Sequence, residues 1–127
     1  MKYLLVLATL LSFSFCSGQT MEDDIQGKWF IDSIVRSGND VSKEHNPQNN
    51  RYIEFKEDGT FESGGDPYGK NSGKFYVNNH VNSLHLDSDV GPNDDSYWAI
   101  TFEKGVMKWR GTGSDFAKEF VITYKSR

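Results

Sequence analysis

Residues 52–61 have the sequence Tyr-Ile-Glu-Phe-Lys-Glu-Asp-Gly-Thr-Phe. Apolar and charged side chains alternate as far as Lys56, and the pair Asp58-Gly59 then interrupts the pattern before the apolar residues resume. Alternation with a period of two is typical of a strand with one buried face. Asp-Gly between two such runs is a strong signal for a tight hairpin turn. This stretch therefore predicts two neighbouring antiparallel strands.

The rest of the chain after residue 27 continues in the same way, with short runs rich in β-branched and aromatic residues between clusters of Gly, Asn, Asp and Pro. No segment of ten or more residues keeps an apolar period of 3.6, so the sequence predicts an all-β fold. The polar segment 37–50 is too long for a hairpin turn, and we expect a large surface loop there. The predicted strands are residues 28–36, 51–56, 60–63, 74–78, 83–87, 97–103, 106–110 and 119–125.

Each predicted strand has one apolar face. A single inward face over eight strands indicates a closed antiparallel up-and-down barrel, because closure removes the edges that an open sheet leaves free to pair with other chains. The residues predicted to point inward are Trp29, Ile31, Val35, Ile53, Phe55, Phe61, Phe75, Val77, Leu84, Leu86, Trp98, Ile100, Phe102, Met107, Trp109, Phe120, Ile122 and Tyr124.

The N-terminus has the three regions of a signal peptide: Lys2, then an apolar run, then small and polar residues. The apolar run is shorter than the roughly 20 residues that a membrane-spanning helix needs. We expect residues 1–18 to be removed by cleavage before Gln19, which leaves 19–127 as one domain, secreted or periplasmic. The alternative is a membrane-anchored lipoprotein, acylated on Cys16.

Charge and cysteine content narrow the classes of function. Removal of residues 1–18 takes away one of the 14 basic residues and none of the 18 acidic ones, which leaves a formal charge of −5. This charge argues against a nucleic-acid partner. Cys16 is the only cysteine, so the mature domain has no disulfide and no thiol catalysis. The sequence does not specify an oligomeric state.

The segment Ile25-Gln26-Gly27-Lys28-Trp29 contains a Gly-x-Trp element, and a large loop follows the first strand. The 52–61 hairpin, Gly73-Lys74-Phe75-Tyr76 and the strand with Leu84 and Leu86 come next. This order resembles the small bacterial secreted lipocalin-like domains, which have a calycin-type barrel. The resemblance implies that Gly27 and Trp29 are the fold signature, and it implies a non-catalytic binding protein of the cell envelope or secreted space.

The predicted interior is rich in aromatic residues, and we assigned no Arg or Lys to it. We therefore expect either a packed core or a small apolar ligand at the barrel mouth, with Trp98, Trp109 and Tyr124 as the candidate binding residues. Tyr97 lies on the outer face. No catalytic residues and no cofactor are predicted, because no nucleophile motif and no inward pair of carboxylates is present.

Two further features leave alternatives open. The acidic segment 87–95 has oxygen ligands but lacks the spacing of a calcium loop, and the three histidines lack metal-site spacing, so no metal is predicted. Phe30, Ile34 and Val121 are expected on the outer faces of the first and last strands. Together with the 37–50 loop they suggest the alternative function, a protein-interaction module such as an inhibitor or accessory subunit.

Overall fold

A computed structural model describes residues 20–127, apart from the side chain of Pro92. The predicted signal peptide, residues 1–18, and Cys16 within it lie outside the described residues. The cleavage site and the alternative lipid anchor therefore remain predictions. Within the described part of the chain, no helix has the length and apolar character needed to cross a membrane.

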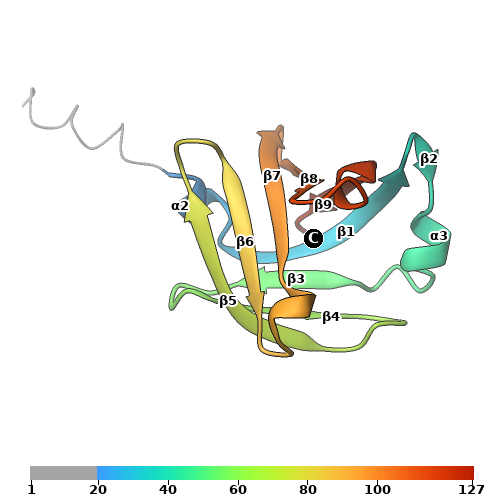
Figure 1. Cartoon of the computed structure of the whole chain (residues 1–127). Coiled ribbons are helices and arrows are strands. Elements are labelled where there is room, and N and C mark those ends of the chain that lie inside the picture. The colour runs from blue at the N-terminus through green and yellow to red at the C-terminus, as the bar shows by residue number, and fades with distance from the viewer. Residues whose placement is uncertain (1–19) are drawn as a thin grey trace, which may run out of the picture.

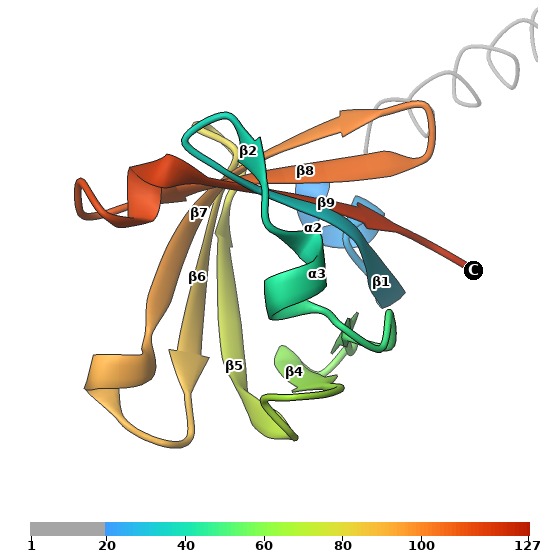
Figure 2. The same cartoon turned by 90° about the vertical axis from the view of Figure 1, so that its right-hand side faces the viewer.

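The described chain is a closed antiparallel barrel of eight strands, as the sequence predicted. Consecutive strands pair in order, and β1 also pairs with β9, which closes the barrel (Figures 1 and 2). The barrel strands are β1 (Gly27–Arg36), β3 (Tyr52–Phe55), β4 (Thr60–Gly64), β5 (Asn71–Asn78), β6 (Ser83–Ser88), β7 (Ser96–Glu103), β8 (Val106–Thr112) and β9 (Phe120–Lys125).

The segment predicted as a long loop after the first strand contains two short elements. The two-residue strand β2 (Asn39–Asp40) folds back on the end of β1, and α3 (Ser42–His45) follows it. Two short 3-10 helices, η1 (Pro92–Asp94) and η2 (Ala117–Glu119), lie between later strands. The helix α2 (Met21–Asp24) precedes the barrel.

The barrel core contains most of the predicted inward side chains. Val77, Trp98 and Phe120 are only partly buried and pack against it. Two predictions of the inward face are wrong: Val35 is half-buried and Phe102 is exposed. Ile34 was predicted on the outer face and is buried, with 3% exposure, because a bulge in β1 reverses the alternation. The predicted residues that are buried are Trp29, Ile31, Ile53, Phe55, Phe61, Phe75, Leu84, Leu86, Ile100, Met107, Trp109, Ile122 and Tyr124.

The two ends of the barrel differ. The helix α2 lies at one end, which we call the floor, and α3 lies at the other, which we call the mouth (Figures 1 and 2). Met21 and Ile25 of the N-terminal segment are buried in the core, and the indole N–H of Trp29 donates to the carbonyl of Ile25 at 2.8 Å. The floor is therefore filled by apolar side chains.

Candidate functional site

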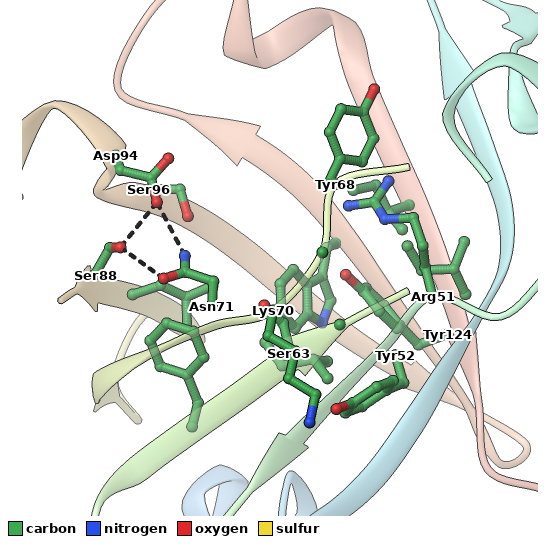
Figure 3. A pocket seen from close by; sticks show the side chains of 18 of the residues that line it. Arg51, Tyr52, Ser63, Tyr68, Lys70, Asn71, Ser88, Asp94, Ser96 and Tyr124 are labelled. Carbon is green, nitrogen blue, oxygen red and sulfur yellow. Dashed lines mark hydrogen bonds between the residues drawn. The ribbon is translucent and has the colours of Figure 1, made fainter. Parts of the chain in front are cut away.

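A cavity of about 510 Å³ lies at the mouth of the barrel (Figure 3). Its volume is within the range of about 300–1,000 Å³ that small-molecule sites occupy. The residues around it come from all eight barrel strands, chiefly from the starts of β3, β5 and β7 and the ends of β4 and β6, and from the adjoining loops. Its apolar lining consists of Ile31, Ile53, Phe61, Leu86, Trp98, Trp109 and Ile122.

The three predicted ligand-binding residues lie together in this cavity. The rings of Trp109 and Tyr124 are 4.5 Å apart between centroids, and those of Trp98 and Trp109 are 5.3 Å apart. Trp98 is half-buried, and its indole N–H donates to the hydroxyl of Ser96 at 2.8 Å. Trp109 is almost fully buried, and its indole N–H has no hydrogen-bond partner among the described residues. The same aromatic cluster thus forms part of the cavity wall and part of the barrel core.

One polar wall of the cavity is a closed hydrogen-bond network. The carboxylate of Asp94 accepts from the amide of Asn71 at 2.9 Å and lies 2.8 Å from the hydroxyl of Ser88. The Ser88 hydroxyl also accepts from the backbone N–H of Val90. These contacts bring the acidic segment 87–95 to the mouth. Within the described chain, no group of three or more His, Cys, Asp or Glu side chains is arranged to hold a metal ion.

The opposite wall carries a positive charge that the sequence analysis missed. Arg51 lines the cavity immediately before β3. It lies two residues before Ile53 and therefore shares the inward side, so our assignment of no basic residue to the interior is wrong. Its guanidinium lies 4.6 Å from the ring centroid of Tyr68, and it donates to the backbone carbonyl of His45 at 2.9 Å. Lys70 also lines the cavity and is exposed.

Two mouth loops are joined at this wall. The imidazole Nδ1 of His45, at the end of α3, is 2.9 Å from the hydroxyl of Tyr68, and the two rings are stacked. Nearby in the same loops, the side-chain amide of Asn50 donates to the carboxylate of Asp66, and the side-chain Oδ1 of Asn50 accepts from the backbone N–H of Asp66. The segment before β3 and the segment after β4 are thereby held beside Arg51.

Burial dominates the electrostatics of Tyr124. The loss of water around its ring raises the pKa of the Tyr124 hydroxyl well above its ordinary value, and the positive charge of Arg51 opposes this shift. The hydroxyl is therefore protonated at neutral pH and is available as a donor. Between β3 and β4, the hydroxyl of Tyr52 donates to Glu62 at 2.8 Å, which lowers the pKa of that carboxyl group.

The three residues predicted as a partner surface are not brought together. Ile34 is in the core. Phe30 lies opposite Lys125 and Val121 lies opposite Val35, so these two residues are at opposite ends of the β1–β9 pairing. The ring of Phe30 is covered by the guanidinium of Arg127 at 4.2 Å. No continuous apolar patch is formed by this set.

The predicted fold signature marks the start of the barrel. Gly27 has a φ of +97°, a backbone conformation that residues with a Cβ rarely adopt. This conformation lets the chain turn from α2 into β1, so that Trp29 points into the floor and contacts Ile25. The Gly-x-Trp element thus joins the floor helix to the first strand.

The fold and the cavity define a class, a small closed antiparallel β-barrel with a filled floor and a hollow mouth. Among solved structures, the chain is similar to a DUF4847 family protein from Bacteroides vulgatus, with a TM-score of 0.59 and 15% sequence identity. The match covers 81% of this chain and 94% of that protein. At this identity the similarity shows a shared barrel fold. No family model matches the sequence, and no curated protein matches it.

Other cavity residues missed by the sequence analysis lie in the loop after β4 or at the very start of β5. Tyr68, Lys70 and Asn71 follow the Gly64-Gly65 break, where strand alternation gives no information about orientation. Strand alternation carried a usable signal for Arg51, which shares the parity of Ile53, and for Ser63, which shares the parity of Phe61.

Proposed function

We propose that this protein is a non-catalytic binding protein that takes a small, largely apolar molecule into the cavity at the barrel mouth. The observation that supports the proposal is the cavity of about 510 Å³, which is walled by the Trp98, Trp109 and Tyr124 cluster. Apolar and aromatic walls with a few polar groups are typical of small-molecule sites. The filled floor leaves the mouth as the route of entry.

The test is a titration with the neutral fluorescent probe N-phenylnaphthylamine. We expect saturable binding and energy transfer from the tryptophans, because Trp98 and Trp109 line the cavity. Ser63→Phe should abolish this binding, since Ser63 lines the cavity and the larger side chain would fill it. Ser72→Phe is the matched control, because Ser72 is exposed on the neighbouring strand. Equal probe binding by the two variants, or no more binding than to a folded protein without a cavity, contradicts the proposal.

A second candidate is the protein-interaction function, and a different surface favours it. Tyr76, His85 and Tyr97 lie directly opposite one another on β5, β6 and β7. The rings of His85 and Tyr97 are stacked at 4.4 Å, and Tyr76 and Tyr97 are about half exposed (52% and 48%). We call this set the aromatic strip. Aromatic residues are enriched at protein interfaces.

The strip is tested by replacing both tyrosines with Ser and comparing sedimentation and pull-down profiles with those of the wild-type protein. If the strip is the interface, the double variant should lose the complexes formed by the wild type and keep its unfolding midpoint within a few degrees. If every complex persists, this second candidate is contradicted.

A further inference from the structure

We propose that the mouth cavity selects ligands that combine an apolar ring or chain with an anionic oxygen group such as a carboxylate, and that Tyr124 and Arg51 bind this anionic group. The inference rests on the proposed function and specifies its ligand class. A purely apolar ligand was the expectation from the sequence. The positive charge of Arg51 and the hydroxyl donor of Tyr124, on one wall of the cavity, indicate a different class of ligand.

The first observation is the hydroxyl of Tyr124. The side chain is 5% exposed, stacks on Trp109 and lines the cavity. No hydrogen bond to another residue of the described range acts on its hydroxyl, where burial and the charge of Arg51 are the influences on its pKa. Among the described side chains, the enclosed polar atoms without a hydrogen-bond partner are Trp109 Nε1 and His85 Nε2, and the latter lies 3.5 Å from the Asp95 carboxylate. The Tyr124 hydroxyl is therefore neither paired nor enclosed, and it opens into the cavity.

A ligand that fills the cavity displaces water from this hydroxyl, and the hydroxyl then stays hydrogen-bonded only if the ligand supplies an acceptor. Burial raises the pKa of Tyr124, so the hydroxyl keeps its proton and acts as a donor to an acceptor on the ligand. An oxygen atom of a carboxylate satisfies this requirement. A hydrocarbon does not.

The second observation is the fixed position of Arg51. Its guanidinium is held by the ring of Tyr68 and by the carbonyl of His45. Arg has five N–H donors, and the His45 carbonyl takes one of them. Arg51 and Tyr124 both line the cavity, and the positive charge of Arg51 opposes the effect of burial on the pKa of the Tyr124 hydroxyl. Figure 3 shows Arg51, Tyr68 and Tyr124 on the same side of the cavity.

The opposite wall does not compete for an anion. Asp94 is engaged by Asn71 and Ser88, on the other side of the cavity from Arg51 (Figure 3). An amphipathic ligand therefore has one orientation that matches both walls: its anionic group near Arg51 and Tyr124, and its apolar part against Trp98 and Trp109. The planar fork of Arg matches the two oxygens of a carboxylate, which adds geometric selectivity to the charge.

The experiment compares two probes that share one ring system. N-Phenylnaphthylamine is neutral, and anilinonaphthalene sulfonate carries the same rings with an anionic group. We expect the anionic probe to bind about tenfold or more tightly, because hydrogen bonds to a charged group are stronger than those to a neutral group. Naphthylacetate should displace it at lower concentration than naphthylethanol, its neutral counterpart, which tests the carboxylate directly.

Three variants test which residues cause the tighter binding of the anionic probe. Arg51→Met should weaken the anionic probe about tenfold and leave the neutral probe within about twofold, because it removes the charge and keeps a similar volume. Tyr124→Phe should weaken the anionic probe about threefold to tenfold and preserve the fold, because it removes only the unpaired hydroxyl. Lys108→Met is the control, since Lys108 is exposed on β8 and does not line the cavity.

The outcomes separate this inference from the proposed function. If neither probe binds more tightly than to a control protein, the proposed function fails and the inference fails with it. If the neutral probe binds but the anionic probe gains nothing, or loses nothing in Arg51→Met and Tyr124→Phe, the cavity is a binding site without anion selectivity. Binding of the neutral probe by each variant, together with its near-UV circular dichroism, shows that the variant is folded.

Discussion

Asp32 is an extra residue in β1 that changes the direction of every side chain after it. Ile31 lies opposite Tyr124, and Ser33 lies opposite Thr123, so the backbone of Asp32 has no residue opposite it in the register with β9. A bulge of this kind shifts the inward and outward alternation by one position. Ile34 consequently enters the core and Val35 leaves it. The carboxylate of Asp32 is 3.3 Å from the ammonium group of Lys125 on the outer surface.

The bulge can be tested with two alanine substitutions at adjacent positions. Ile34→Ala should lower the free energy of unfolding by about 2–5 kcal/mol, since it removes buried methyl groups and leaves a cavity. Val35→Ala should cost less than about 1 kcal/mol, because Val35 is half-exposed. Urea unfolding followed by tryptophan fluorescence measures both. The reverse order of the two costs would mean that β1 has no bulge and that the original alternation holds.

The same bulge explains a limit of sequence-based prediction at single residues. Alternation placed Trp29 and Ile31 correctly, but nothing in the residues around Asp32 announces an extra position, because the pairing with β9 creates it. For the cavity, alternation identified Trp98, Trp109 and Tyr124. The same argument could have identified Arg51. Tyr68 and Lys70 lie in a loop whose path depends on tertiary contacts, so alternation does not predict them.

The hairpin of β3 and β4 is an element whose turn chemistry is visible in the sequence. Gly59 has a φ of +86°, and Asp58 accepts hydrogen bonds from the hydroxyl of Thr60 at 2.6 Å and from its backbone N–H at 3.0 Å. The Thr60 hydroxyl and then its N–H lower the pKa of Asp58 below its ordinary value of 3.8. The ionised side chain thus closes the turn.

This turn should make stability depend on pH in a defined direction. Because the pKa of Asp58 is lower in the folded protein, protonation favours the unfolded chain. Its stabilising effect is complete above the unfolded pKa of about 3.8 and is lost as the pH falls through the lower folded pKa. Asp58→Asn keeps an acceptor but cannot titrate. The stability difference between the wild type and this variant should therefore shrink with acidification.

Urea midpoints at about pH 6 and at about pH 2.5 measure that difference on either side of the titration. The comparison is needed because the pKa values of Asp40 and Glu62 are also lowered, so both proteins lose stability in acid. A difference that stays constant across this range would show that Asp58 does not hold the turn through its charge.

Elements differ in how well the sequence predicts them. All eight barrel strands coincide with predicted strands to within a few residues, because each combines alternation with turn residues at its ends. The helices α2 and α3 were not predicted, since four residues are too few to show a 3.6-residue period. Their positions depend on contacts with the barrel, such as the Asn79 side chain that accepts from the N–H of Met21.

At the scale of the whole molecule, the barrel is closed at the floor and hollow at the mouth. Ile25 is fully enclosed beneath Trp29, and α2 is held in place by a capping box in which Thr20 and Asp23 bond reciprocally. The apolar residues that close the floor are therefore separate from the aromatic cluster that lines the cavity. Stability at one end and binding at the other should respond to different substitutions.

Ile25→Ala tests this separation. The substitution should lower the free energy of unfolding by about 2–5 kcal/mol, because it removes most of a fully enclosed side chain. Gln26→Ala is the matched control, since Gln26 is the next residue and is half-exposed. Below the unfolding transition, Ile25→Ala should still bind N-phenylnaphthylamine within about twofold of the wild type, because Ile25 does not line the mouth cavity. Loss of probe binding in a variant that remains folded would show that the floor helix shapes the mouth, and that the two ends of the barrel are coupled through the core.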